Sequence, residues 1–205
     1  MTAKIDLRKT YKELYSAKAE PSLLRVPALA CLAVDGAGDP NNSQRFADCV
    51  AALYSAAYTL KFALKKARGL DWGMLGLEGD WWSEDMSAFA SGEKANWKWT
   101  LLIVQPDSVT EAEAEIAIEA ARAKKEASPA LSELRFERRL AEEAAHILHI
   151  GPYDAETENI ARLHAFIAEG GLKPSGRHRE IYLSDARRTA PDKLKTIIRQ
   201  PVSRR

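Results

Sequence analysis

Cysteine is scarce in this chain of 205 residues, which contains only Cys31 and Cys49. Neither cysteine belongs to a Cys-x-x-Cys pair, so the sequence indicates neither a disulfide framework nor a zinc knuckle. We therefore predict no metal site. The expected compartment is the reducing cytoplasm, where disulfides are rare.

Long hydrophobic runs are also absent. The longest, residues 28–34, is far too short to cross a bilayer, and residues 1–18 are too polar for a signal peptide. The sequence has no glycine-rich or Walker nucleotide-binding loop, no His-Glu-x-x-His motif and no Gly-x-Ser-x-Gly elbow. We predict no cofactor and no membrane partner.

Neither sign of charge dominates, since 30 Lys and Arg face 29 Asp and Glu, for a net charge of +1. Such a chain has no overall field to attract nucleic acid. Residues 173–205 do carry ten basic and three acidic side chains, a net of +7. We interpret this basic end as neutralising the acidic middle of the chain, and predict no nucleic-acid partner.

Tryptophan is concentrated in one window. All five tryptophans fall within 28 consecutive positions, namely Trp72, Trp81, Trp82, Trp97 and Trp99. Two adjacent residues of a strand point to opposite faces, so one of Trp81 and Trp82 can pack in a core while the other lines a groove. For a single tryptophan, core packing is the better interpretation. Five so close together also suit a stacking platform for a flat or cationic ligand.

The chain is internally repeated. The order strand, strand, helix, strand, strand occurs twice, and residues 101–106 (LLIVQP) match residues 196–201 (TIIRQP). The fold class predicted is α+β, with duplicated strand-helix-strand-strand modules, pseudo-two-fold symmetry, antiparallel sheets and a central ligand groove. Residues 1–20 form an extension, and residues 21–202 form the domain. Within it we expect repeat one at 21–108, a connecting helix at 110–127 and repeat two at 130–202.

Local signals define several helix ends. Asn42 or Ser43 can cap the first long helix, Gly69 ends it, and Thr110 with Glu113 forms a capping box for the connecting helix. We expect this acidic, Ala-rich helix to lie on the surface.

Glu180 is the most interesting carboxylate, because it stands at the start of an apolar strand. If it points inward, desolvation would raise its pKa and suit it to act as a general base or to pair with a cationic ligand. The alternative is a surface glutamate paired with Arg179 or Arg187. Glu78 has the same two interpretations, as a site residue or as the plain end of its strand.

Other candidates are ambiguous. Tyr54, Tyr58 and Phe62 recur every four residues and form either a core edge or a binding wall. His146 and His149 fall on opposite faces of a strand, so they cannot share a metal. His178 could orient Glu180, although an exposed loop histidine is the simpler interpretation.

Several motifs together resemble the GyrI-like small-molecule-binding family, over about residues 5–202. They occur in the family's order and are Val34-Asp-Gly-Ala-Gly-Asp-Pro40, Leu53-Tyr-Ser-Ala-Ala-Tyr-Thr-Leu-Lys61, Leu77-Glu-Gly-Asp-Trp-Trp82, Trp97-Lys-Trp-Thr100, His149-Ile-Gly-Pro-Tyr-Asp154 and Glu180-Ile-Tyr-Leu-Ser-Asp185.

The resemblance implies a duplicated module with a buried glutamate at the centre of its groove, and the matching position is Glu180. The branch with Trp-Trp and Tyr-Ser-x-x-Tyr motifs is similar to cyclopropanoid cyclopropyl hydrolases, which open the reactive cyclopropane of yatakemycin-type DNA-alkylating compounds with water. This chain departs from the branch pattern at Asp80, Arg179 and Ala186. Asp80 would make the groove more polar or favour a cationic ligand.

Three functional hypotheses follow. In the first, an enzyme uses Glu180 as general base and Tyr153 or Tyr182 to stabilise a developing phenolate, while a ligand-binding wall contains Trp81, Trp82, Trp99, Tyr54, Tyr58 and Glu78. In the second, the same groove sequesters flat aromatic cations without chemistry. In the third, the chain regulates a protein partner. A monomer and a weak dimer are both compatible with the sequence.

Overall fold

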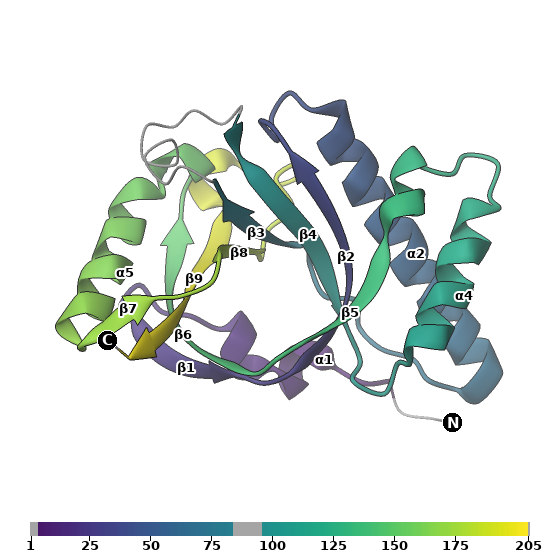
Figure 1. Ribbon diagram of the computed structural model, residues 1–205, viewed down its shortest axis with the longest axis horizontal. Coiled ribbons are helices and arrows are strands. Elements are labelled where there is room, and N and C mark those ends of the chain that lie inside the picture. Colours follow the sequence, from purple (N-terminus) through teal and green to yellow (C-terminus); the bar gives the residue numbers. More distant parts are fainter. Residues whose placement is uncertain (1–3, 84–95, 205) are drawn as a thin grey trace. The chain divides into compact units, whose positions relative to one another are not determined.

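The computed structural model describes residues 4–83 and 96–204. The chain divides into two compact units, each built from helices and antiparallel strands (Figure 1). Unit 1 contains Met1–Thr10 and Leu29–Arg139, and unit 2 contains Tyr11–Ala28 and Leu140–Arg205. The predicted α+β class is confirmed.

Unit 1 contains a sheet whose strands follow the order β3-β4-β2-β5, with every neighbouring pair antiparallel. Its elements are α1 (Leu7–Thr10), β2 (Leu29–Ala37), α2 (Gln44–Arg68), β3 (Glu78–Trp82), β4 (Lys98–Gln105), α4 (Glu111–Arg122), the 3-10 helix η3 (Pro129–Glu133) and β5 (Arg135–Arg139).

Unit 2 contains the strand order β1-β6-β9-β8, again antiparallel, and β7 pairs with β9. Its elements are η1 (Lys12–Tyr15), β1 (Ser22–Val26), β6 (Glu142–Ile150), η4 (Tyr153–Ala155), α5 (Thr157–Glu169), β7 (Leu172–Pro174), β8 (His178–Tyr182), η5 (Pro191–Lys193) and β9 (Lys195–Arg204). The three-residue strand β7 was not predicted.

The two units repeat one arrangement. In β2-α2-β3-β4 and in β6-α5-β8-β9, the first strand pairs with the last and the last pairs with the third. The outer strands, however, are exchanged. β1 precedes β2 in the chain but pairs with β6, whereas β5 precedes β6 but pairs with β2. The two-residue linkers 27–28 and 140–141 therefore carry the chain from one unit to the other instead of closing a hairpin.

The helix ends follow the local signals. The Ser43 side chain accepts a hydrogen bond from the Phe46 amide at the start of α2, and Gly69 ends the helix in the left-handed conformation with φ of 69°. Thr110 and Glu113 form the predicted capping box of α4. These three predictions are confirmed.

The core of unit 1 lies between α2 and the sheet. The buried face of α2 packs on β2 and β4 and consists of Cys49, Ala52, Leu53, Ala56, Ala57, Leu60 and Leu64. Helix α4 packs on α2 with a buried face of Ala114, Ala117, Ile118 and Ala121, and the three small alanine side chains permit a close approach. The Ala-rich sequence of α4 thus serves helix packing inside unit 1.

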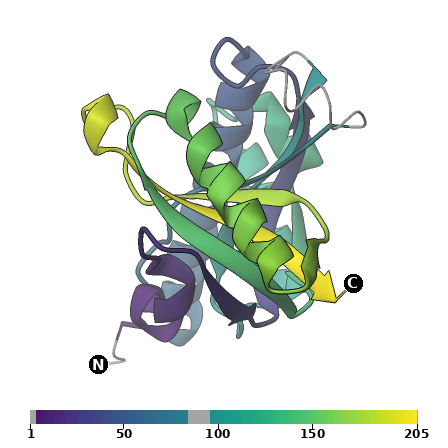
Figure 2. The same cartoon turned by 90° about the vertical axis from the view of Figure 1, so that its left-hand side faces the viewer.

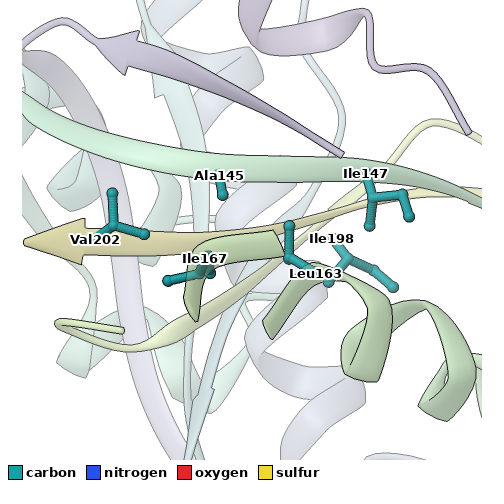
Figure 3. Packing of buried hydrophobic residues seen from close by; sticks show 6 residues of the cluster. All are labelled: Ala145, Ile147, Leu163, Ile167, Ile198 and Val202. Atoms are coloured by element: carbon teal, nitrogen blue, oxygen red, sulfur yellow. The ribbon is translucent and has the colours of Figure 1, made fainter. Parts of the chain in front are cut away.

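The core of unit 2 lies under α5, which crosses one face of the sheet (Figure 2). Leu163 and Ile167 of α5 meet Ala145 and Ile147 of β6 together with Ile198 and Val202 of β9 (Figure 3). Among the helices in the described part of the chain, none is long and apolar enough to span a membrane.

Candidate functional site

Glu180 and Tyr182 form a hydrogen-bonded pair on β8. The Tyr182 hydroxyl donates to Glu180 Oε2 at 2.7 Å. The pair forms because residues two apart on a strand share one face. The ring of Tyr153, on η4, meets the Tyr182 ring edge to face, with centroids 5.6 Å apart and planes at 77°. Two phenols and one carboxylate are therefore neighbours in unit 2.

His178 belongs to the same cluster. Its Nε2 atom lies 3.7 Å from Glu180 Oε1, and the residue is only 8% exposed. The interpretation of His178 as an exposed loop histidine is therefore wrong. β8 begins at residue 178 and not at 180, so alternation along the strand places both side chains on one face.

The surroundings of Glu180 do not match those of a surface ion pair. Its side chain is 13% exposed, and Arg187 pairs with Asp185, not with Glu180. Arg179 is the adjacent residue on the strand, so its side chain emerges from the opposite face. The cluster faces α5, because Glu180 lies opposite Ile198 and Ile198 packs against that helix.

Tyr153 is held protonated. Its pKa is raised, first by burial and then by the negative charges of Glu180, Glu156 and Asp185. The residue nevertheless remains 38% exposed. Its hydroxyl therefore keeps its proton and the ability to donate a hydrogen bond.

Three of the tryptophans form a packed cluster in unit 1. Trp81 lies opposite Trp99 across β3 and β4, and Phe46 of α2 approaches their rings with centroid distances of 6.2 and 5.2 Å. Trp97 completes the cluster at 5.8 Å from Trp81. Trp81 is 3% exposed and Trp99 is 0% exposed, so both serve the core beneath α2.

Gly36 makes room for this cluster. A Cβ atom at that position would lie 2.0 Å from the Trp99 ring, well inside any allowed contact. The glycine of the Val34-Asp-Gly motif thus has a packing role on β2.

Trp82 emerges from the opposite face of β3 and is partly exposed. Glu78 and Asp80 share that face, and both are buried. Asp80 forms an ion pair with Arg139, which also contacts Glu137 at 2.7 Å. The polar residue that departs from the branch pattern is therefore paired with an arginine of β5.

The aromatic stripe of α2 lies outside the core. The rings of Tyr54, Tyr58 and Phe62 stack in sequence with centroid distances of 6.4 and 6.1 Å. Tyr58 and Phe62 are exposed, while Tyr54 is partly buried. The stripe offers ring faces for a flat ligand, a role that stays a prediction.

The predicted site residues thus fall into two sets. Unit 2 brings together Glu180, Tyr153 and Tyr182, and unit 1 holds Trp81, Trp82, Trp99, Tyr54, Tyr58 and Glu78. The groove that would unite the two sets stays a prediction.

The two strand histidines are separate, as their spacing predicts. His146 lies opposite Arg199 on the face away from α5, whereas His149 contacts Pro152 and Asn159. Within residues 4–83 and 96–204, no three His, Cys, Asp or Glu side chains gather as metal ligands do. The role of His149 was missed by sequence reasoning. Its only sequence signal is a strand-end histidine directly before a Gly-Pro turn.

Comparisons with known proteins agree with this architecture. A structure of a conserved protein from Listeria innocua is 37% identical, covers 98% of this chain and 100% of its own, and has a TM-score of 0.89. A Listeria innocua protein described as a hydrolase is 36% identical with the same coverage and a TM-score of 0.87. The EcmrR C-terminal domain shares the fold at 13% identity, with coverages of 91% and 98% and a TM-score of 0.57.

No curated protein matches this sequence significantly. The family model of the GyrI-like small-molecule-binding domain matches residues 19–203, which is nearly the whole chain. This chain therefore belongs to the GyrI-like family of small-molecule-binding domains.

Proposed function

We propose that this protein hydrolyses small electrophilic molecules of the cyclopropanoid class, with Glu180 as general base. The observation that carries the proposal is the Glu180–Tyr182 hydrogen bond on a largely enclosed carboxylate, with Tyr153 beside it. Further support comes from the hydrolase of Listeria innocua, which is 36% identical over 98% of this chain.

The chemistry requires one proton acceptor and one hydrogen-bond donor. Glu180 takes a proton from water, and the water oxygen forms a bond to a strained ring carbon. The cyclopropane carbon–carbon bond breaks, and its electron pair moves into the conjugated ring, which becomes a phenolate. Proton return from Glu180 gives the neutral phenol, so the net reaction is addition of one water.

Each phenol of the cluster has its own task in this proposal. Tyr182 holds Glu180 Oε2, so that the proton from water goes to Oε1, the oxygen that lies near His178. Tyr153 donates to the substrate oxygen on which negative charge develops, and its raised pKa keeps the proton available for that bond.

The aromatic residues of unit 1 divide by exposure. Trp82 is partly exposed on the face of β3 away from α2, so it is the tryptophan that we propose stacks on a flat substrate. Tyr58 offers its exposed ring on α2, on the other side of the sheet, as a separate stacking surface. Trp81 and Trp99 are enclosed and would support the wall from behind. Glu78 is buried on the face of Trp82, where we propose that it sets the polarity of the wall.

The test is hydrolysis of a yatakemycin-type alkylator by the wild type and by Glu180→Gln. Loss of the general base lowers the rate about 10²- to 10⁴-fold. Glu158→Gln is the matched control, because this glutamate is exposed in the first turn of α5. Equal rates for the wild type and Glu180→Gln would remove Glu180 from the mechanism.

A second candidate function is sequestration of flat aromatic cations without chemistry. It is favoured by the exposed ring faces of Tyr58 and Phe62 and by the enclosed carboxylate of Glu180. We expect ethidium to quench tryptophan fluorescence in the wild type and to bind about tenfold or more weakly to Glu180→Gln, since the counter-ion is lost. If the alkylator is recovered unchanged while ethidium still binds, sequestration replaces hydrolysis as the function.

A further inference from the structure

We infer that His149 is a positioning residue, which holds Tyr153 beside Glu180 and Tyr182 through a hydrogen-bond chain with a single allowed direction. The importance of Tyr153 rests on the proposed function, whereas the chain itself is a property of unit 2. All of its members lie in β6, in α5 or in the turn between these elements.

The hydrogen-bond chain begins at Arg162 of α5. Its Nη1 donates to Asn159 Oδ1 at 3.0 Å, and a guanidinium can only donate. This bond fixes the orientation of the Asn159 amide. The Nδ2 group of Asn159, 3.0 Å from His149 Nδ1, must then be the donor of the next bond.

The hydrogen-bond chain ends at the turn before Tyr153. His149 Nε2 lies 3.1 Å from the Pro152 carbonyl oxygen, which can only accept. The ring must therefore carry its proton on Nε2 and present an unprotonated Nδ1 to Asn159. Only the neutral Nε2–H tautomer satisfies both bonds.

The backbone conformation between His149 and Tyr153 leaves room for the contact between His149 Nε2 and the Pro152 carbonyl. Gly151 has φ of 140°, a conformation that side-chain-bearing residues rarely adopt, and its amide donates to the Leu194 carbonyl at 3.0 Å. A Cβ atom on Gly151 would lie 3.3 Å from His149 Nε2. The carbonyl that His149 holds belongs to the residue directly before Tyr153, so the histidine sets where that side chain starts.

The hydrogen-bond chain is more buried than the tyrosine that it positions. His149 is 4% exposed, whereas Tyr153 is 38% exposed and touches Tyr182 by one ring edge. Arg162 is itself anchored, because its Nη2 donates to the Ala19 carbonyl at 3.0 Å. Without the His149 bonds, η4 would lose its link to this anchor, and Tyr153 would move away from Glu180.

The first experiment reads the tautomer directly by nitrogen-15 NMR of the histidine rings. In the wild type we expect His149 to carry its proton on Nε2 alone. In Asn159→Asp, a carboxylate replaces the amide donor opposite Nδ1, so we expect the ring to become doubly protonated. A proton on Nδ1 in the wild type would overturn the assigned direction of the chain.

The second experiment follows the Tyr153 hydroxyl by carbon-13 NMR of labelled tyrosine, with Tyr153→Phe to assign its signal. In His149→Leu we expect the Tyr153 pKa to fall back toward 10, because the hydroxyl leaves its buried place near Glu180. His149→Gln, which can donate to Pro152 and accept from Asn159, should restore part of the shift.

The matched control is His146→Leu. His146 lies on the same strand, is equally buried at 5% exposure and faces the other side of the sheet. A Tyr153 pKa that is equal in His149→Leu, His146→Leu and the wild type would overturn the proposal. If His149→Leu fails to fold by circular dichroism, Asn159→Ala replaces it in the same comparison.

Neither readout uses a substrate, so the failure of this inference is distinguishable from the failure of the proposed hydrolysis. If hydrolysis is observed, His149→Leu should lower kcat more than it raises KM, because Tyr153 acts on charge that develops in the transition state.

Discussion

His146 is a histidine that the fold keeps neutral. Burial, and secondarily the positive charge of Arg199, lower its pKa from 6.5 to about 4. Its Nδ1 atom has no hydrogen-bond partner among the residues that the structure describes. The unfolded chain therefore binds a proton at higher pH than the folded chain does. The associated stability is fully present above pH 6.5 and is lost as the pH falls toward 4.

We predict a pH-dependent difference between the wild type and His146→Leu. Between pH 7.5 and pH 5 the wild type should lose about 2 kcal/mol more of its unfolding free energy than the variant, since only the wild type carries this group. Urea unfolding at both pH values measures the difference. Parallel losses in the two proteins would contradict the lowered pKa of His146.

At the residue scale, the sequence predicted which strand face a side chain occupies better than it predicted how deeply that side chain is buried. Alternation correctly placed Trp81 and Trp82 on opposite sides of β3, but it could not tell which of them lies under α2. That choice depends on Phe46, which is distant in sequence. His178 was misjudged because the start of β8 was expected two residues too late.

At the scale of elements, local signals sufficed where the determining contacts are local. Ser43, Gly69 and the Thr110–Glu113 box satisfy backbone groups within a few residues, so both ends of α2 and the start of α4 could be predicted. The helix α4 ends at Arg122, whereas the connecting helix was expected to reach residue 127. β7 has only three residues and exists through its pairing with β9, about 30 positions later. No local sequence pattern predicts a strand of this kind.

The site follows the same division. The shared face of Glu180 and Tyr182 is a consequence of strand alternation, so their pairing was within reach of the sequence. The Arg162–Asn159–His149 chain joins α5 to the end of β6, and its side chains come together only when the helix docks on the sheet. Spacing along the chain does not reveal it.

At the scale of the whole molecule, nonlocal pairing decides how the repeats are assembled. The repeated order of strands was visible in sequence, and the pairing of the long strands repeats as well. The exchange of β1 and β5 between the units could not be predicted from the sequence, because two strands joined by two residues can equally form a hairpin.

Because the outer strands are exchanged, each half of the chain contains a strand whose pairing partner belongs to the other half. Cut between residues 127 and 128, the first fragment keeps β1 without its neighbour β6, and the second keeps β5 without β2. We predict that fragments 1–127 and 128–205 are each largely unfolded alone and fold on mixing, as circular dichroism and size-exclusion chromatography would show. Independent folding of either fragment would contradict this. Each half of the chain thus supplies one strand to the sheet of the other half.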